Sequence, residues 1–445
     1  MASTYLQRTQ TAGNQKTFTI SSWLKRSGNF ANYNHLFTNS PNPGTWDSVR
    51  FDNDDQLAVR INNDSYVIKT NRKFRDASGW YHIVIAVDTT QGTSSNRVKI
   101  YVNGTQETSL ASSSYPTQNL DTNFNKNSQI IRIGQNSWSS GNQTFDGSMS
   151  YAALVDGTQE LPTIFGETDS VTGQWKIKTG ITPSSGWGNN GFLILKNSNS
   201  VTDQSGQGNN FTVGSGTLTN TEDCPDNVFA TMNSLANFAG QWALFENQNT
   251  YVRSAGSGEA FIASTLGIPA TSGKFYTEVK YTAGGSESNI GLSSTSFPTS
   301  STDFVGKALN SYSYSQNGEK RFNNNSSSYG NSYAPGDIIG IAVDATNSKL
   351  YFSKNGVFQN SGDPTSGATG TGAISISATP TEGFYYMACS KESGSTKNLY
   401  AWNFGNGFFQ TSAVSSAGTA GSTPGIFEYD VPSGYEPLST KGLNA

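Results

Sequence analysis

Side chains that could catalyse a reaction are sparse in this 445-residue chain. Hydrolysis of a glycosidic bond generally uses two carboxylates about 5 to 9.5 Å apart. The nearest acid pair, in Glu167-Thr168-Asp169, lies in a turn-rich stretch, where a turn or capping role is the simpler explanation. His82 lies in the alternating stretch "WYHIVIAVD" and His35 has no nucleophilic Ser or Cys motif beside it, so packing roles are favoured over general-base roles. We therefore predict that the protein is not an enzyme, unless carboxylates from separate strands converge.

Metal binding is predicted at one place only. The stretch "RFDNDDQLAVR" places Asp52, Asp54 and Asp55 in a turn, and calcium prefers such clustered oxygen donors. The spacing is not that of an EF-hand, and an ordinary hairpin turn is the alternative. With two histidines and two cysteines, Cys224 and Cys389, in the whole chain, a Cys/His metal site and a disulfide framework are both excluded. No cofactor other than calcium is expected.

Loops rich in amides and aromatic rings are the best candidates for ligand binding. Sugar recognition uses amide and backbone groups for the hydroxyls and an aromatic ring for the apolar face of the sugar. Three loops have this composition: "QNSWSSGNQTF", "RFNNNSSSYGNSYAPGD" and "PNPGTWDS". Solvated loops or subunit contacts are the alternative explanation. The candidate binding residues are Asn136, Trp138 and Asn142 in the first loop, Tyr329 and Tyr333 in the second, and Trp46 in the third.

Charge and hydropathy exclude several kinds of partner. The formal net charge of −4 provides no general attraction to nucleic acid. No run approaches the roughly 18 apolar residues of a membrane span, and the N-terminus lacks an apolar signal-peptide core, so we expect a soluble chain without membrane insertion. The one basic cluster, "KTNRKFRD" at 69–76, is either a solvated turn or a contact with an acidic glycan or a neighbouring subunit.

Apolar residues alternate with period two through most of the chain, as in "FTISSWLKR" and "RVKIYVNG", which predicts β-strands. Asn-Gly pairs at 103, 317 and 355 predict hairpin turns, because both residues tolerate a positive φ. No segment has a sustained helical stripe, so the predicted fold class is all-β, with two antiparallel β-sandwiches. The stretch "IAVD" occurs twice and marks a central strand in each sandwich, with Ile85/Val87 and Ile341/Val343 as predicted buried positions.

Ordered series of motifs resemble two known families. Residues 1–160 resemble a laminin-G/concanavalin-like jelly roll through "KTFTISSWLKR", "GWYHIVIAVD", "RVKIYVNGTQ", "IRIGQNS" and "FDGSMSYAALVDG". Residues 227–411 resemble a SPRY domain through "GKFYTEVKY", "NIGLSS", "YSYSQNGEKRFNN", "KLYFSKNGVFQ" and "AWNFGNGFF". The first resemblance implies that a glucanase would carry an acid series similar to Glu-x-Asp-x-x-Glu, which this chain lacks. The second implies a partner-binding face formed by loops at one rim, including the second aromatic loop.

The remaining segments are a connector and a tail. Residues 161–226 are expected to be a structured connector, and one interpretation is that it adds strands to the first sandwich. Residues 412–445 are expected to be a flexible linker and a tail: the composition of "TSAVSSAGTAGST", which starts at 411, is typical of a flexible linker, and the aromatic residues of the tail suggest docking.

The order of both domains, with "TYLQRTQTAGNQKTFT" before them and "YDVPSGYEPLSTKGL" after them, resembles a marine bacteriophage virion protein. This resemblance implies a tail-fibre or surface component on the phage particle, made in the host cytoplasm, with other virion proteins and a host-cell surface glycan or protein receptor as partners. An architectural role in capsid decoration or as a fibre adaptor is the first alternative, and a polysaccharide depolymerase is the second. A homo-oligomer is possible, although no heptad or shaft repeat is present.

Overall fold

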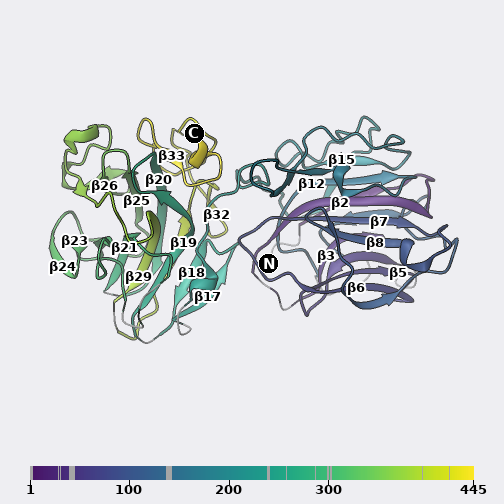
Figure 1. The fold of residues 1–445 in the computed structure, drawn as a ribbon, viewed down its shortest axis with the longest axis horizontal. Helices are drawn as coiled ribbons and strands as arrows, with labels where there is room; N and C mark the ends of the chain where they lie inside the picture. Colours follow the sequence, from purple (N-terminus) through teal and green to yellow (C-terminus); the bar gives the residue numbers. More distant parts are fainter. Residues whose placement is uncertain are drawn as a thin grey trace. The chain divides into compact units, whose positions relative to one another are not determined.

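The chain divides into two compact units, unit 1 at 1–220 and unit 2 at 221–445, and β-strands make up nearly all of the regular secondary structure described in each. The computed structural model describes residues 4–28, 30, 32–39, 46–136, 143–237, 241–256, 258–285, 287–297, 300, 303–392, 394–419 and 421–445 (Figure 1). Within these ranges the only helical pieces are 3₁₀ turns at η1 (Ser94–Asn96), η2 (Pro162–Ile164), η3 (Ser234–Ala236), η5 (Gln359–Ser361), η6 (Gly367–Thr369) and η7 (Gly442–Asn444). No helix among the described residues is long and apolar enough to span a membrane.

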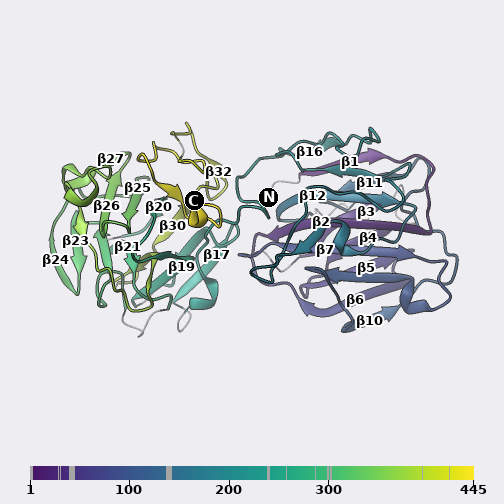
Figure 2. The same cartoon turned by 45° about the horizontal axis from the view of Figure 1, so that its top comes forward.

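Unit 1 contains two antiparallel sheets, as the period-two pattern predicts; Figure 2 shows the strands of the larger sheet following one another from β16 to β10. The eight-stranded sheet has the order β10 (Leu110–Ser114), β6 (Tyr66–Lys73), β5 (Gln56–Ile61), β4 (Asp47–Phe51), β3 (Asn34–Asn39), β11 (Ile130–Ile133), β1 (Tyr5–Thr9), β16 (Thr212–Ser215). The six-stranded sheet has the order β15 (Phe192–Ile194), β12 (Gly147–Asp156), β2 (Thr17–Arg26), β7 (Tyr81–Asp88), β8 (Val98–Val102), β9 (Thr105–Gln106).

The connector adds strands to unit 1. β15 pairs with β12, and β16 pairs with β1, so residues from 161 onward contribute to both sheets. Before β15 and β16 in the chain, β13 (Gly166–Thr168) and β14 (Trp175–Ile177) form a separate hairpin. Phe165 and Trp187 of the connector pack on Val84 and Ala86, which lie on the face of β7 opposite to the predicted core residues Ile85/Val87. β7 is therefore buried on both faces, and the predicted burial of Ile85 and Val87 is confirmed.

Unit 2 also contains two large sheets, and its predicted core residues Ile341 and Val343 are fully buried. One sheet has the order β17 (Trp242–Glu246), β18 (Tyr251–Ser254), β30 (Leu399–Asn403), β20 (Lys274–Ala283), β25 (Ile338–Asp344), β26 (Lys349–Lys354), β27 (Val357–Phe358), with β28 (Ile374–Ser375) beside β26 and β33 (Glu436–Pro437) beside β20. The other has the order β19 (Ala260–Pro269), β29 (Phe384–Lys391), β21 (Ser288–Ser293), β22 (Tyr312–Ser315), β23 (Glu319–Phe322), β24 (Asn325–Ser328). A short hairpin joins β31 (Phe408–Phe409) to β32 (Ser412–Ala413).

The Asn-Gly pairs form the predicted hairpin turns in two ways. Asn103-Gly104 and Asn355-Gly356 have a positive φ at both residues, as a type I′ turn requires. At 317–318 only Gly318 has a positive φ, and the loop between β22 and β23 is correspondingly longer than two residues. The all-β prediction is confirmed, with turn chemistry that differs at one of the three sites.

The C-terminal tail docks on unit 2 itself. β33 pairs in parallel with β20, and Figure 1 shows it in yellow beside that strand. Phe427 and Tyr435 of the tail are buried against Tyr276 and Tyr351 on the outer face of the β20–β25–β26 sheet. The docking expected from the tail aromatics is thus intramolecular.

Candidate binding site

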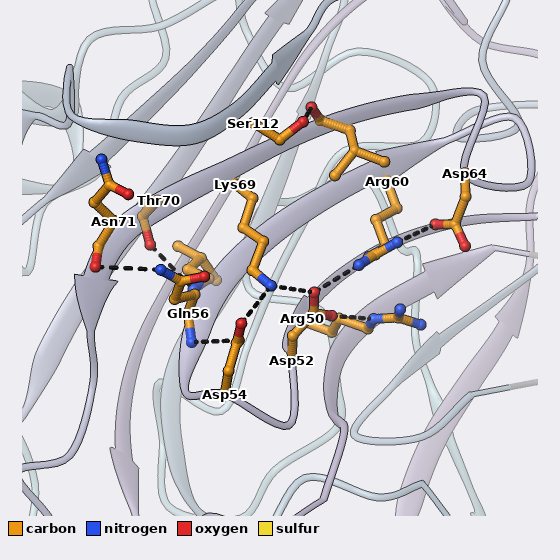
Figure 3. Close-up of polar contacts among 12 residues, drawn as sticks. Arg50, Asp52, Asp54, Gln56, Arg60, Asp64, Lys69, Thr70, Asn71 and Ser112 are labelled. Atoms are coloured by element: carbon orange, nitrogen blue, oxygen red, sulfur yellow. Dashed lines mark hydrogen bonds and ion pairs between the residues drawn. The ribbon is translucent and has the colours of Figure 1, made fainter.

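The acidic turn predicted to bind calcium is held by basic side chains from neighbouring strands (Figure 3). Asp52 Oδ1 accepts a hydrogen bond from Arg50 Nε at 2.8 Å, and its Oδ2 accepts one from Arg60 Nη2 at 2.6 Å. Lys69 Nζ lies 3.1 Å from Asp52 Oδ2 and 2.7 Å from Asp54 Oδ2. Burial alone would raise the pKa of Asp52, but the hydrogen bonds from Arg60 and Arg50 hold it below its ordinary value. Strand alternation places these cations and carboxylates on one face, where they neutralise one another.

Asp55 points away from the other two carboxylates. Its φ of 71° ends the turn, and its carboxylate pairs with Arg26 at 3.1 Å and Arg75 at 2.8 Å. Among the described residues, no group of three His, Cys, Asp or Glu side chains converges as a metal site would require. We therefore revise the calcium prediction for Asp52, Asp54 and Asp55: these residues form a salt-bridge network.

Two predicted sugar-binding residues lie buried near this network. Trp46 is 9% exposed, and the Arg50 guanidinium lies 5.7 Å from the centre of its ring. Asn136 is 3% exposed, and its Nδ2 donates to Gln143 Oε1 at 3.1 Å, an oxygen that also lies 3.0 Å from His35 Nε2. Both side chains therefore stabilise the fold and offer no open surface to a sugar. Trp138 and Asn142, predicted in the same loop as Asn136, lie outside the described residues.

His82 has a serine partner but not the arrangement of a catalytic base. Its Nε2 lies 2.9 Å from Ser21 Oγ, and its Nδ1 accepts a hydrogen bond from Trp175 Nε1 at 2.9 Å. Burial lowers the pKa of His82 to about 3, so the ring is neutral. Because an indole N–H only donates, the proton of the neutral ring belongs on Nε2, which then donates to Ser21. His82 therefore cannot accept the Ser21 proton, in agreement with the predicted packing role.

In unit 2, the two predicted loop tyrosines lie in the core. Tyr329 is 5% and Tyr333 2% exposed. The Tyr329 hydroxyl accepts a hydrogen bond from the Phe352 backbone N–H at 3.2 Å, and the Tyr333 hydroxyl donates to the Ser288 carbonyl at 2.9 Å. Because each hydroxyl has an internal partner, a polar loop can bury its aromatic rings in this way. We correct the prediction for both residues, since neither presents a ring face to solvent.

Tyr333 nevertheless forms part of the wall of a pocket of about 450 Å³. The pocket lies where β21, β22 and β23 meet the loop at 332–333 and the residue after β29. Polar side chains supply most of its lining. The lining residues that carry the argument are Asn289, Ser315, Gln316, Arg321, Tyr333 and Glu392.

Three residues of this lining have buried side-chain atoms with no hydrogen-bond partner among the described residues. Asn289 is fully buried; its Oδ1 accepts a hydrogen bond from Ser315 Oγ at 2.5 Å, whereas its Nδ2 has no partner. Gln316 Oε1 and Arg321 Nε are also buried without partners. Arg321 is held in place by an ion pair with Glu392 at 2.5 Å. Since native proteins leave few buried polar groups unpaired, these atoms indicate a place for water or a ligand.

Sequence patterns did not single out Asn289, Gln316, Arg321 or Glu392. One signal was present: in "SNIGLSS" the residues at 290 and 292 alternate into the apolar core, so the amide at 289 lies on the opposite face of a strand that is buried throughout. Because a buried amide in a central strand requires hydrogen-bond partners, this pattern could have identified Asn289 as a candidate site residue.

Both units have folds typical of binding domains, and comparisons with known proteins agree. Residues 1–161 match the family described as "Concanavalin A-like lectin/glucanases superfamily", and residues 274–383 match the SPRY domain family. A concanavalin-like domain and a SPRY domain are thus found in this chain. No curated protein matches its sequence.

Solved structures with similar folds share little sequence with the chain. A human SPRY domain is 15% identical, with 36% of this chain and 94% of that chain covered and a TM-score of 0.27. A SAP-like pentraxin from Limulus polyphemus is 17% identical, with 34% and 69% covered and a TM-score of 0.26. A candidate carbohydrate-binding protein from Bacteroides ovatus is 16% identical, with 49% and 58% covered and a TM-score of 0.35. None of these likenesses bears on ligand or activity.

Proposed function

We propose that this chain is a non-catalytic recognition protein of a bacteriophage particle, a tail fibre or surface appendage, and that the pocket of unit 2 binds a glycan on the host-cell surface. The observation that carries the proposal is a pocket of about 450 Å³ lined by Asn289, Gln316 and Arg321, three residues that also have buried polar atoms without a hydrogen-bond partner among the described residues. The matches to two families of binding folds support a binding role.

A glycan suits the chemistry of this pocket. Each sugar hydroxyl donates one hydrogen bond and accepts up to two, and the residues that line the pocket include amide, hydroxyl and guanidinium side chains at Asn289, Ser315, Gln316 and Arg321. The ion pair with Glu392 compensates the charge of Arg321, so a neutral hydroxyl-rich ligand does not have to supply a counter-charge. Contacts of this kind give weak binding per site, and many copies on one particle strengthen it.

The particle assignment is supported by the N-terminal and C-terminal motifs that resemble a phage virion protein. It implies synthesis in the host cytoplasm, assembly with other virion proteins, and a place on the surface or tail of the particle. A purely architectural role is the second candidate, favoured by clustered polar residues that serve the fold itself, such as the buried Asp52 with its ion pairs to Arg50, Arg60 and Lys69.

A glycan array and a whole-cell binding assay with multivalent protein test the proposal. Gln316→Ala should weaken glycan binding roughly two- to tenfold, as expected for one neutral hydrogen bond. Asn325→Ala on β24, an exposed amide outside the pocket lining, is the matched control. Absence of binding to any permissive host, or equal binding by both variants, would refute the glycan proposal. Release of reducing ends from host polysaccharide would instead support the depolymerase alternative.

A further inference from the structure

A second groove lies in unit 1, against the turn that joins β8 to β9. The hairpin β13–β14 approaches the Asn103-Gly104 turn, and the space between them has a volume of about 460 Å³. This groove lies apart from the Asp52 network, and neither the sequence motifs nor the family resemblances point to it. Its lining includes Asn103, Gly104, Thr105, Thr168, Gln174 and Trp175.

The half-buried Trp175 is fixed in position before any ligand arrives. Its Nε1–H donates to His82 Nδ1 at 2.9 Å, and the His82 ring stacks on Trp23 with centroids 4.7 Å apart. The backbone also holds the indole, because a Cβ at Gly104 would come within 2.4 Å of it and a Cβ at Gly166 within 2.5 Å. A rigid aromatic ring loses little conformational entropy on binding, which favours recognition of a weakly interacting ligand.

The polar side chains that line the groove are uncharged, and of these Asn103 has an internal partner, since its Oδ1 accepts a hydrogen bond from the His82 backbone N–H at 2.8 Å. The side chains of Thr105, Thr168 and Gln174 are exposed and make no hydrogen bond within the described part of the chain. The charged residues of the hairpin pair among themselves, because Lys176 Nζ lies 3.1 Å from Asp169 Oδ2 and 3.5 Å from Glu167 Oε1. A charged ligand would therefore find no counter-ion in the groove, whereas a neutral ligand with several hydroxyls would find hydroxyl and amide partners beside an indole.

We propose that this groove is a second carbohydrate site, which takes a neutral sugar unit of an oligosaccharide or polysaccharide. Thr105, Thr168 and Gln174 bind the hydroxyls, and Trp175 provides the apolar contact. The groove shares the ligand class of the proposed function but not its residues, so either site can fail without the other.

Binding of neutral gluco-, manno- and galacto-oligosaccharides to the full chain, measured by isothermal titration and saturation-transfer NMR, tests the inference. Thr168→Val and Gln174→Leu should each weaken binding roughly two- to tenfold, since each removes one neutral hydrogen bond from an exposed position. Thr163→Val is the matched control, because Thr163 is exposed and does not line the groove. Asn325→Ala in unit 2, an exposed position that lines neither pocket, should leave this binding unchanged.

Three results would overturn the inference: no neutral oligosaccharide binds at millimolar concentration, uronate or sulfated analogues bind more tightly, or Thr168→Val and Gln174→Leu bind as the control does. Trp175→Phe, which keeps a ring but loses the hydrogen bond to His82, should change the intrinsic fluorescence response to sugar. If Trp175→Phe disturbs the fold, the binding measurement on Thr168→Val still tests the inference.

Discussion

Glu278 should make the stability of unit 2 depend on pH in a predictable direction. This residue of β20 is fully buried where the tail docks, and its carboxylate accepts the backbone N–H groups of Glu428 at 2.8 Å and Tyr429 at 2.9 Å. The Tyr276 hydroxyl donates a third hydrogen bond at 3.1 Å. Burial outweighs these hydrogen bonds and raises the pKa of Glu278 to about 7, from an ordinary value of 4.5.

Proton linkage determines whether the unfolding free energy rises or falls with pH. Between pH 4.5 and 7 the folded protein keeps a proton on Glu278 that the unfolded chain has lost, so the stabilising effect is fully present below pH 4.5 and disappears as the pH rises through 7. A shift of about 2.5 pKa units corresponds to about 3 kcal/mol in total. Most of this change, about 2 to 3 kcal/mol, falls between pH 5 and pH 8.

Glu278→Gln isolates this effect, because glutamine does not titrate. We expect wild type to lose about 2 to 3 kcal/mol of unfolding free energy relative to the variant between pH 5 and pH 8, measured by urea denaturation of the transition that includes unit 2. Glu436→Gln is the control: hydrogen bonds from Ser422 and Thr423 overcome its partial burial and lower the pKa of Glu436, so its effect appears only in more acidic solution. A wild-type minus Glu278→Gln difference that is flat with pH, or that favours wild type at pH 8, would refute the reasoning.

Three other perturbations have expected outcomes. Asp52→Asn leaves Arg50, Arg60 and Lys69 without their shared carboxylate and should lower the unfolding free energy of unit 1 by roughly 3 to 5 kcal/mol in urea denaturation. Asp64→Asn breaks only the partly exposed pair with Arg60 and should lower it by less than about 1 kcal/mol, so equal effects of the two variants would contradict the network. Addition of calcium or EDTA should leave the Tm unchanged, because the carboxylates at 52–55 already have basic partners, and a calcium-dependent rise in Tm would restore the original metal prediction. Deletion of 424–445 removes the buried side chains of Phe427, Val431 and Tyr435 and should destabilise unit 2 by at least about 3 kcal/mol in the same assay; full stability of the truncated chain would show that the docking is incidental.

Local patterns predicted the elements of the fold well, because strand alternation and turn chemistry depend on neighbours in the sequence. Ile85 and Ile341 are buried in the strands that "IAVD" marked, and the Asn103-Gly104 turn has the two positive φ values of a type I′ hairpin. The contacts of the C-terminal tail could not be predicted from local patterns. The backbone of Glu428 meets Glu278 across 150 positions, and no periodicity in either segment encodes that contact.

Binding residues were predicted less well, because a polar loop does not reveal which way its aromatic rings lie. Tyr329 and Tyr333 are in an Asn- and Ser-rich loop, yet internal partners for their hydroxyls allow both rings to enter the core. The calcium prediction for the acidic turn is revised for a related reason. Asp52 and Asp54 look like oxygen ligands in the sequence, but the basic residues that neutralise them come from strands whose register only the folded sheet defines.

The pocket of unit 2 is a stronger indication of a ligand than the density of charged residues around Asp52 in unit 1. Asp52 has many polar neighbours, but both of its oxygens already accept hydrogen bonds from arginines, so a ligand would have to displace existing contacts. Asn289 lines the pocket, and its buried Nδ2 has no hydrogen-bond partner among the described residues. An unpaired buried donor costs about 1 to 3 kcal/mol, and a ligand that reached this donor would recover that cost, which is why we propose the pocket as the recognition site.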